Sequence, residues 1–242
     1  MKILLIRHGD PDYEKDSLTE KGWHEAELLA QRMAELEIQS FYVSPLGRAK
    51  DTASCTLKKM GREAEELAWL REFHAPIPDF HTGEPRIPWD QLPADWTAEP
   101  KYYDNIRWAE TLPMLEGHVI DEVNRVWNGL DEVLAKHGYV RNGNYYDAVS
   151  PNEDTLAFFC HFGVKCVMLS HLLGISPMIL WHGFCAAPTS VTSLITEERR
   201  KGVALFRMNA FGDTAHLFAN HEEPAFAARF CEIFANQEQR HD

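Results

Sequence analysis

The fold is decided by the stretch Lys2-Ile3-Leu4-Leu5-Ile6-Arg7-His8-Gly9. Four consecutive apolar residues, two of them β-branched, are too few for a buried helix and are typical of a central parallel strand. The run then ends in an arginine, a histidine and a glycine. Groups just past the carboxyl end of a strand lie in the binding crevice of an open α/β sheet. A lone Arg-His-Gly is weak evidence, so its meaning depends on whether the pattern recurs.

Two further apolar runs end in residues of the same kind. Residues 41–43 are followed by Ser44-Pro45-Leu46-Gly47-Arg48, which opens a helix, and residues 155–160 are followed by His161-Phe162-Gly163. If these strands are parallel neighbours, their carboxyl ends converge, and two guanidinium groups and two imidazoles line one crevice. A phosphoryl group in transfer needs several fixed donors around its oxygens and an in-line nucleophile, which a neutral imidazole can supply. The pattern therefore indicates phosphoryl chemistry.

The remaining periodicity predicts an alternation of helices and strands. Helical spacing, capping residues and stop signals predict helices over residues 17–37, 119–136, 164–173 and 224–234. Short apolar runs predict a strand over residues 67–70 and a hairpin of residues 190–196 and 203–208 at a sheet edge. From residue 73 to about 115 there is no clean period, and seven prolines interrupt the chain. This excursion either covers the crevice and shapes substrate choice or is a surface decoration.

Composition and charge exclude several classes of partner. The chain has 242 residues, 45% of them hydrophobic and 25% charged, which is ordinary for a globular protein with a full core. The formal net charge of -13 argues against nucleic acid or an anionic membrane as a partner. No apolar run has the length of a membrane span, and the N-terminal run is too short for a signal peptide. Five cysteines without metal-like spacing indicate reduced thiols, so we expect a cytoplasmic protein without a metal site.

The motifs taken together resemble the histidine phosphatase superfamily, the phosphoglycerate mutase-like proteins. The N-terminal signature of that family is matched by Arg7-His8-Gly9, and its L-T-x-x-G helix opening by Leu18-Thr19-Glu20-Lys21-Gly22. The family pattern S-P-L-x-R-A-x-x-T-A is closely matched by residues 44–53, and its second-histidine motif by Phe159-Cys160-His161-Phe162-Gly163. The four motifs occur in the family's order and span most of the chain, which is far more specific than any one of them.

The resemblance implies a single domain over residues 1–242 and an α/β fold. It implies a three-layer α/β/α sandwich around a mainly parallel sheet, with an insertion at about residues 73–115 covering the active site. It also implies a phosphohistidine intermediate with His8 as the nucleophile. The acid that protonates the leaving oxygen would be Glu72, because Leu70-Arg71-Glu72 resembles the L-x-E of many members. The catalytic residues implied are His8, Glu72 and His161, and the phosphate-binding residues implied are Arg7, Arg48, His161 and Phe162.

Departures from the family pattern affect which residue is the general acid and whether the reaction is hydrolysis or mutase chemistry. Many members carry glycine where Phe162 stands, and the usual stretch after the acid is replaced by Phe73-His74-Ala75. Asp10, Asp12 or Glu84 could therefore substitute for Glu72. Mutases hold the substrate carboxylate with a basic cluster, whereas the basic residues of the excursion are dispersed among acids and aromatics: Arg86, Lys101 and Arg107. Hydrolysis of a small organic phosphate is favoured over mutase chemistry.

Two other hypotheses come from different classes of protein. Asp10-Pro11-Asp12 resembles the D-x-D of Mg²⁺-dependent aspartyl phosphatases, but Arg7-His8-Gly9 separates it from the strand end and Glu14 replaces the expected Thr or Val. A phosphate- or phosphopeptide-binding module without turnover is the non-enzyme alternative, and the retained His8 argues against it because a binder needs only the cations. We expect a small phosphorylated substrate, no cofactor, no nucleic acid and no membrane. The edge hairpin leaves a homodimer open.

Overall fold

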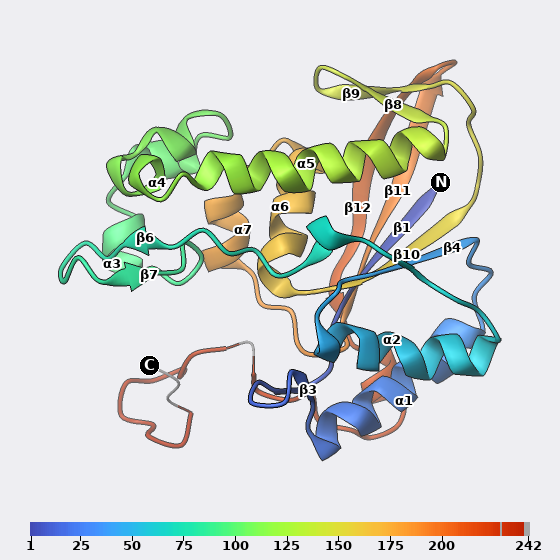
Figure 1. Cartoon of the computed structure of the whole chain (residues 1–242), viewed down its shortest axis with the longest axis horizontal. Coiled ribbons are helices and arrows are strands. Elements are labelled where there is room, and N and C mark those ends of the chain that lie inside the picture. The colour runs from blue at the N-terminus through green and yellow to red at the C-terminus, as the bar shows by residue number, and fades with distance from the viewer. Residues whose placement is uncertain (228, 240–242) are drawn as a thin grey trace.

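The computed structural model describes residues 1–227 and 229–239 (Figure 1). The strands within these residues are β1 Lys2–Arg7, β2 Pro11–Asp12, β3 Ser17–Leu18, β4 Ser40–Val43, β5 Glu65–Glu66, β6 Ile77–Pro78, β7 Pro85–Arg86, β8 Tyr139–Asn142, β9 Tyr145–Ala148, β10 Thr155–Cys160, β11 Val191–Arg200 and β12 Val203–Asp213. The helices are α1 Glu20–Ala34, α2 Gly47–Met60, α3 Pro93–Trp96, α4 Leu112–Glu116, α5 Val119–Lys136, α6 Phe162–Leu173, α7 Pro177–Gly183 and α8 Ala215–Phe218. Short 3₁₀ turns are η1 Ala68–Leu70, η2 Pro100–Tyr103 and η3 Arg107–Glu110.

A mixed sheet forms the centre of the molecule. Among the described residues it has eight strands in the order β5-β4-β10-β1-β11-β12-β9-β8. The half from β5 to β1 is parallel, and every pairing from β1 to β8 is antiparallel. The α/β fold is as expected, but only this half of the sheet is parallel. Since β4, β10 and β1 are adjacent and parallel, their carboxyl ends meet at one edge of the sheet, as the three motifs require.

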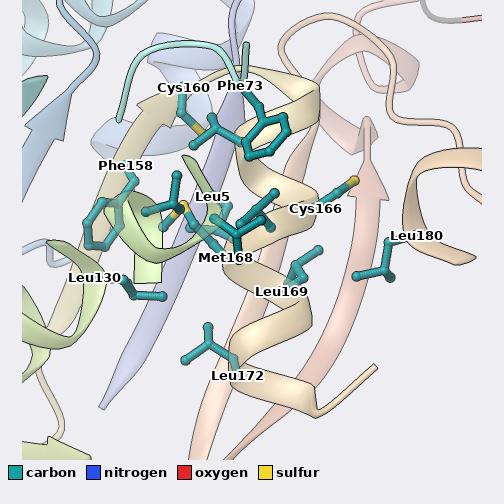
Figure 2. Close-up of a cluster of buried hydrophobic side chains, with 14 of the residues drawn as sticks. Leu5, Phe73, Leu130, Phe158, Cys160, Cys166, Met168, Leu169, Leu172 and Leu180 are labelled. Carbon is teal, nitrogen blue, oxygen red and sulfur yellow. The ribbon is translucent and has the colours of Figure 1, made fainter. Parts of the chain in front are cut away.

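Helices cover both faces of the sheet. In β1, Ile3 and Leu5 belong to one buried cluster and Leu4 and Ile6 to the other, because successive side chains of a strand point to opposite faces. The smaller cluster lies under α1 and α2, and the larger lies under α5, α6 and α7 (Figure 1). Figure 2 shows Leu5 of β1 within the larger cluster, beside the apolar side chains of α6. The first strand is thereby buried on both sides, which fixes the position of the residues that follow it.

Four sequence predictions of local structure are corrected or limited. Residues 68–70 form η1 instead of a strand: Leu67 and Leu70, three residues apart, are buried, while Ala68 between them is exposed. The hairpin of β11 and β12 lies inside the sheet and not at its edge, because β9 and β8 extend the sheet beyond β12. The first helix ends at Ala34 rather than near residue 37. The described residues of 224–234 form turns and irregular backbone instead of a helix, and residue 228 lies outside the described residues.

The excursion at residues 73–115 contains the β6–β7 hairpin, α3, η2, η3 and the start of α4. It packs against the rest of the molecule through aromatic rings. The ring centroids of Phe73 and Trp181 of α7 are 5.3 Å apart, and those of Trp89 and Phe162, the first residue of α6, are 6.3 Å apart. The excursion therefore adjoins the edge where β10 ends. No helix in the described part of the chain is long and apolar enough to span a membrane.

Candidate active site

His8 lies directly after β1 and is held in one tautomer. Its side chain is 2% exposed, and its Nδ1 donates to the Gly9 carbonyl oxygen at 2.7 Å. Because a carbonyl oxygen only accepts, Nδ1 carries the proton and Nε2 keeps its lone pair. Burial, and then the nearby Arg7 guanidinium, lower the pKa of His8 well below its usual value. The imidazole is therefore neutral at physiological pH, with one nitrogen free to attack.

His161 follows β10 and faces His8 across the parallel strands. The two ring centroids are 5.1 Å apart, and His161 is fully buried as the N-cap residue of α6. Its Nε2 is 2.7 Å from the Ser44 hydroxyl, which also accepts a long 3.3 Å bond from the Leu46 N–H. When the Ser44 hydroxyl donates to Nε2, the proton of His161 lies on Nδ1. That Nδ1–H has no acceptor within residues 1–227 and 229–239, so it is available to an anion.

Two arginines contribute guanidinium groups to the same edge. Arg7 is 4% exposed and donates from its terminal nitrogens to the carbonyls of Ala186, at 2.8 Å, and Ala227, at 3.0 Å. Arg48 lies in the first turn of α2 and is paired with Asp16 at 2.6 Å. The Nε atoms of both arginines are buried without an acceptor in the part of the chain that the structure describes. Unpaired buried donors of this kind are available to hydrogen-bond an anion.

Glu72 lies at the amino end of α6. Its Oε1 accepts from the N–H groups of Phe73, at 2.7 Å, and Val164, at 2.9 Å, and its Oε2 accepts from Gly163 at 3.2 Å. A Cβ on Gly163 would come within 2.7 Å of Oε1, so this glycine allows the carboxyl group to approach the helix. Burial raises the pKa of Glu72, although the three N–H donors oppose the shift. A raised pKa suits a carboxyl group that must hold a proton until it is needed.

The structure brings most of the predicted site residues together. His8, His161, Arg7, Arg48 and Glu72 interact electrostatically with one another. Phe162 is the first residue of α6, and its ring lies against Trp89. The three alternative acids have other surroundings: Asp10 accepts from the Thr19 hydroxyl, Asp12 pairs with Lys15, and Glu84 is exposed beside β7.

Sequence reasoning missed three residues of this region. Ser44 orients His161, and Asp16 holds Arg48 through a loop that folds back over α2. Lys165, in the second turn of α6, is fully buried beside the cluster. The available signal for Lys165 was a single lysine within the apolar run of residues 164–169, four residues after His161. Among the described residues, no three His, Cys, Asp or Glu side chains gather in a geometry that could hold a metal ion.

The arrangement can support phosphoryl transfer. A neutral imidazole with a free Nε2, unpaired donors from three side chains, and a carboxyl group of raised pKa lie at one edge of the sheet. These are the elements that transfer to a nitrogen nucleophile needs: fixed donors for the phosphoryl oxygens and an acid for the leaving group.

Comparisons with known proteins agree with this geometry. A model of the histidine phosphatase superfamily (branch 1) matches residues 3–209. A probable phosphoglycerate mutase of Photorhabdus laumondii is 36% identical over 83 residues, covering 31% of this chain and 39% of the mutase. A probable phosphatase of Schizosaccharomyces pombe is 24% identical over 90% of this chain and 95% of its own length. A crystal structure of a phosphoserine phosphatase mutant from Entamoeba histolytica has a TM-score of 0.58 and 19% identity, covering 89% of this chain and 98% of that one.

Proposed function

Because the chain belongs to the histidine phosphatase superfamily (branch 1), we propose that it hydrolyses phosphomonoesters of small organic molecules through a phosphohistidine on His8. The observation that carries this proposal is the 2.7 Å bond from His8 Nδ1 to the Gly9 carbonyl, which leaves Nε2 free to attack phosphorus. A binding module would need the cations but would not need this tautomer.

Each of the other site residues takes a role from its geometry. Nε2 of His8 attacks the phosphorus, and the free donors of Arg7, Arg48 and His161 bind the equatorial oxygens. Glu72 gives its proton to the leaving oxygen, since its pKa is raised, and then takes one from the water that hydrolyses the phosphohistidine. Phe162 adjoins the phosphoryl group at the start of α6 and narrows the space beside it.

Hydrolysis is favoured over mutase chemistry because the basic residues of the excursion are already paired with acidic side chains. Each already has an acidic partner: Arg86 pairs with Asp79 at 3.5 Å, and both Lys101, at 3.9 Å, and Arg107, at 3.2 Å, pair with Glu110. No basic cluster is thus free in this segment to hold a substrate carboxylate. The mutase-named relative above shares only 39% of its length with this chain, whereas the phosphatase-named relative shares 95%.

A panel of phosphorylated metabolites tests the proposal. The panel includes 3-phosphoglycerate, and both inorganic phosphate and isomerised product are measured. Acid-labile, base-stable phosphate on the protein after rapid quenching would support the phosphohistidine. Isomer without free phosphate would make the protein a mutase. If no substrate of the panel is turned over but the protein still binds inorganic phosphate, the binding module would be favoured.

The Glu72→Gln variant tests the assignment of the acid. A phenolic leaving group such as p-nitrophenolate departs without a proton, whereas an alkoxide needs one. We expect kcat for an alkyl phosphate to fall by about 10²-fold or more and kcat for p-nitrophenyl phosphate to change by less than about tenfold. The amide still accepts hydrogen bonds from the start of α6, so the helix keeps part of its cap. Equal losses for the two substrates would place the acid elsewhere.

A further inference from the structure

Lys165 is a buried cation with no hydrogen-bond acceptor. Its side chain is fully buried, and no atom of residues 1–227 and 229–239 accepts from its Nζ. The ammonium instead lies 4.8 Å from the centre of the Phe211 ring and 5.8 Å from the centre of the Phe162 ring. Two aromatic faces reduce the cost of burying a cation but do not replace a hydrogen-bonded anion.

The position of Lys165 on α6 directs it toward the phosphoryl site. Side chains of a helix lean toward its amino end, so a lysine one turn after His161 reaches back to the level of that residue. The 5.8 Å contact with Phe162, the first residue of the helix, agrees with this direction. Lys165 also lowers the pKa of His8, which follows β1. The ammonium is thus electrostatically coupled to the residue that we propose as the nucleophile.

None of the described groups around Lys165 forms a hydrogen bond or an ion pair with its ammonium. Lys165 interacts electrostatically with Arg7 at the end of β1, His8 directly after it, Cys160 of β10, Cys166 of its own helix and Glu72 of the segment after η1. Burial raises the pKa of both thiols, so they are neutral. Glu72 already accepts three N–H bonds. Burial lowers the pKa of Lys165 to about 8, so in the free protein the lysine is mostly charged at pH 7 and loses its proton as the pH rises through 8.

We propose that Lys165 is a further cationic residue of the phosphoryl site, and that its ammonium acquires its counter-ion only when the dianionic phosphoryl group binds. This inference rests on the proposed function, because it takes the site to hold a phosphoryl group. At pH 8 and above, binding of the dianion restores the proton to the neutral fraction of Lys165, and the ammonium then stabilises the negative oxygens during transfer. Lys165 therefore acts as a charged ligand in one protonation state and not in the other.

Calorimetric titration with inorganic phosphate, in buffers of different ionisation enthalpy, measures both affinity and proton uptake. The variants are Lys165→Met, which has a similar length and no charge, and Lys58→Met, which removes the same charge from an exposed position near the end of α2. At pH 7 we expect Lys165→Met to bind phosphate roughly 10–100-fold more weakly, as befits the loss of a hydrogen bond from a charged group. Lys58→Met should bind as the wild type does.

Proton uptake distinguishes a charged ligand from a packing residue. With a pKa of about 8 in the free protein, the wild type should take up roughly half a proton more than Lys165→Met at pH 8 and close to one more at pH 9. Taking the difference removes the ionisation of phosphate itself. Lys165→Arg, which stays charged throughout, should recover affinity without the additional proton. The methionine side chain suits the apolar surroundings, so we expect the Lys165→Met variant to fold.

The outcomes separate this role from the proposed function. Equal phosphate affinity and equal proton uptake in the wild type and Lys165→Met would overturn the role of Lys165 and leave the phosphatase proposal standing. Failure of the wild type to bind phosphate at all would overturn the phosphoryl site, and the role of Lys165 with it. Weaker binding in Lys165→Met without a difference in proton uptake would also contradict the proposal, because the lysine would then be charged before the anion arrives.

Discussion

Replacing His8 with alanine is expected to lower phosphate release by about 10⁴-fold or more, because removal of a covalent nucleophile abolishes the intermediate. The Nε2 of His161, the other imidazole of the site, is engaged with the Ser44 hydroxyl at 2.7 Å, whereas the hydrogen bond of His8 Nδ1 leaves its Nε2 free. Binding should survive, because the donors of Arg7, Arg48 and His161 remain. The measurement is kcat for the best substrate of the panel, together with the Kd of inorganic phosphate.

Two further variants make this result interpretable. In His8→Ala the buried Gly9 carbonyl loses its side-chain donor, which costs about 1–3 kcal/mol of folding free energy. His8→Asn places an amide N–H where Nδ1–H was, so it can keep that bond while providing no nucleophile. His74→Ala removes an exposed imidazole from the excursion and should behave as the wild type. Full turnover in a folded His8→Asn protein would exclude the phosphohistidine mechanism.

The core of the site could be predicted because it depends on strand ends. A short apolar run with an arginine or histidine after it marks both the strand and its end, and parallel pairing of β4, β10 and β1 then brings the ends together. Thr19, which belongs to the L-T-x-x-G helix opening, caps α1 in the structure by accepting from the Gly22 N–H. These features depend on local sequence and on one topological rule, that the carboxyl ends of adjacent parallel strands lie together.

The features that sequence reasoning missed depend mostly on contacts between segments that are distant in the sequence. The ion pair of Asp16 with Arg48 forms because the loop after β2 folds back onto α2, and no local pattern encodes that return. Lys165 was readable as an isolated charge in an apolar helix, but its neighbours Phe211 and Glu72 come from β12 and from the segment after η1. The β8–β9 hairpin had a local signal that was overlooked: its two-residue turn is Gly143-Asn144, with a glycine of φ 59° at the first position.

The sheet topology also explains why the site lies where parallel pairing ends. β1 is the last parallel strand, and its other neighbour, β11, runs antiparallel. The backbone before β11 therefore arrives at the same edge at which β1 ends, and it supplies the Ala186 carbonyl that holds Arg7. One guanidinium nitrogen is thus fixed by this segment, while Nε is left for the anion. The antiparallel half of the sheet orients a residue that the parallel half provides.

Replacing Arg48 with alanine is the second large effect that we expect, a fall in kcat/KM of about 10²–10³-fold, typical of removing one preorganised donor from a developing negative charge. Arg48 is held before substrate arrives: one terminal nitrogen is fixed by Asp16, and the guanidinium carbon lies 5.5 Å from the centre of the Tyr13 ring. The side chain is 12% exposed, so solvent cannot replace it fully. A substrate with the same phosphoryl group and a different leaving group should lose the same factor.

Control variants distinguish the loss of the Arg48 hydrogen-bond donors from the loss of its charge and from a loss of folding stability. Arg48→Lys keeps the charge but loses the planar set of donors, so it should recover only part of kcat/KM. Arg199→Ala removes a guanidinium whose side chain is 85% exposed on β11, and should leave kcat/KM unchanged. Asp16 is 43% exposed, so water can solvate it when Arg48 is removed, and denaturant midpoints of the variants should differ little. A kcat/KM for Arg48→Ala within a few fold of the wild type would show that the buried Nε does not meet the phosphoryl group.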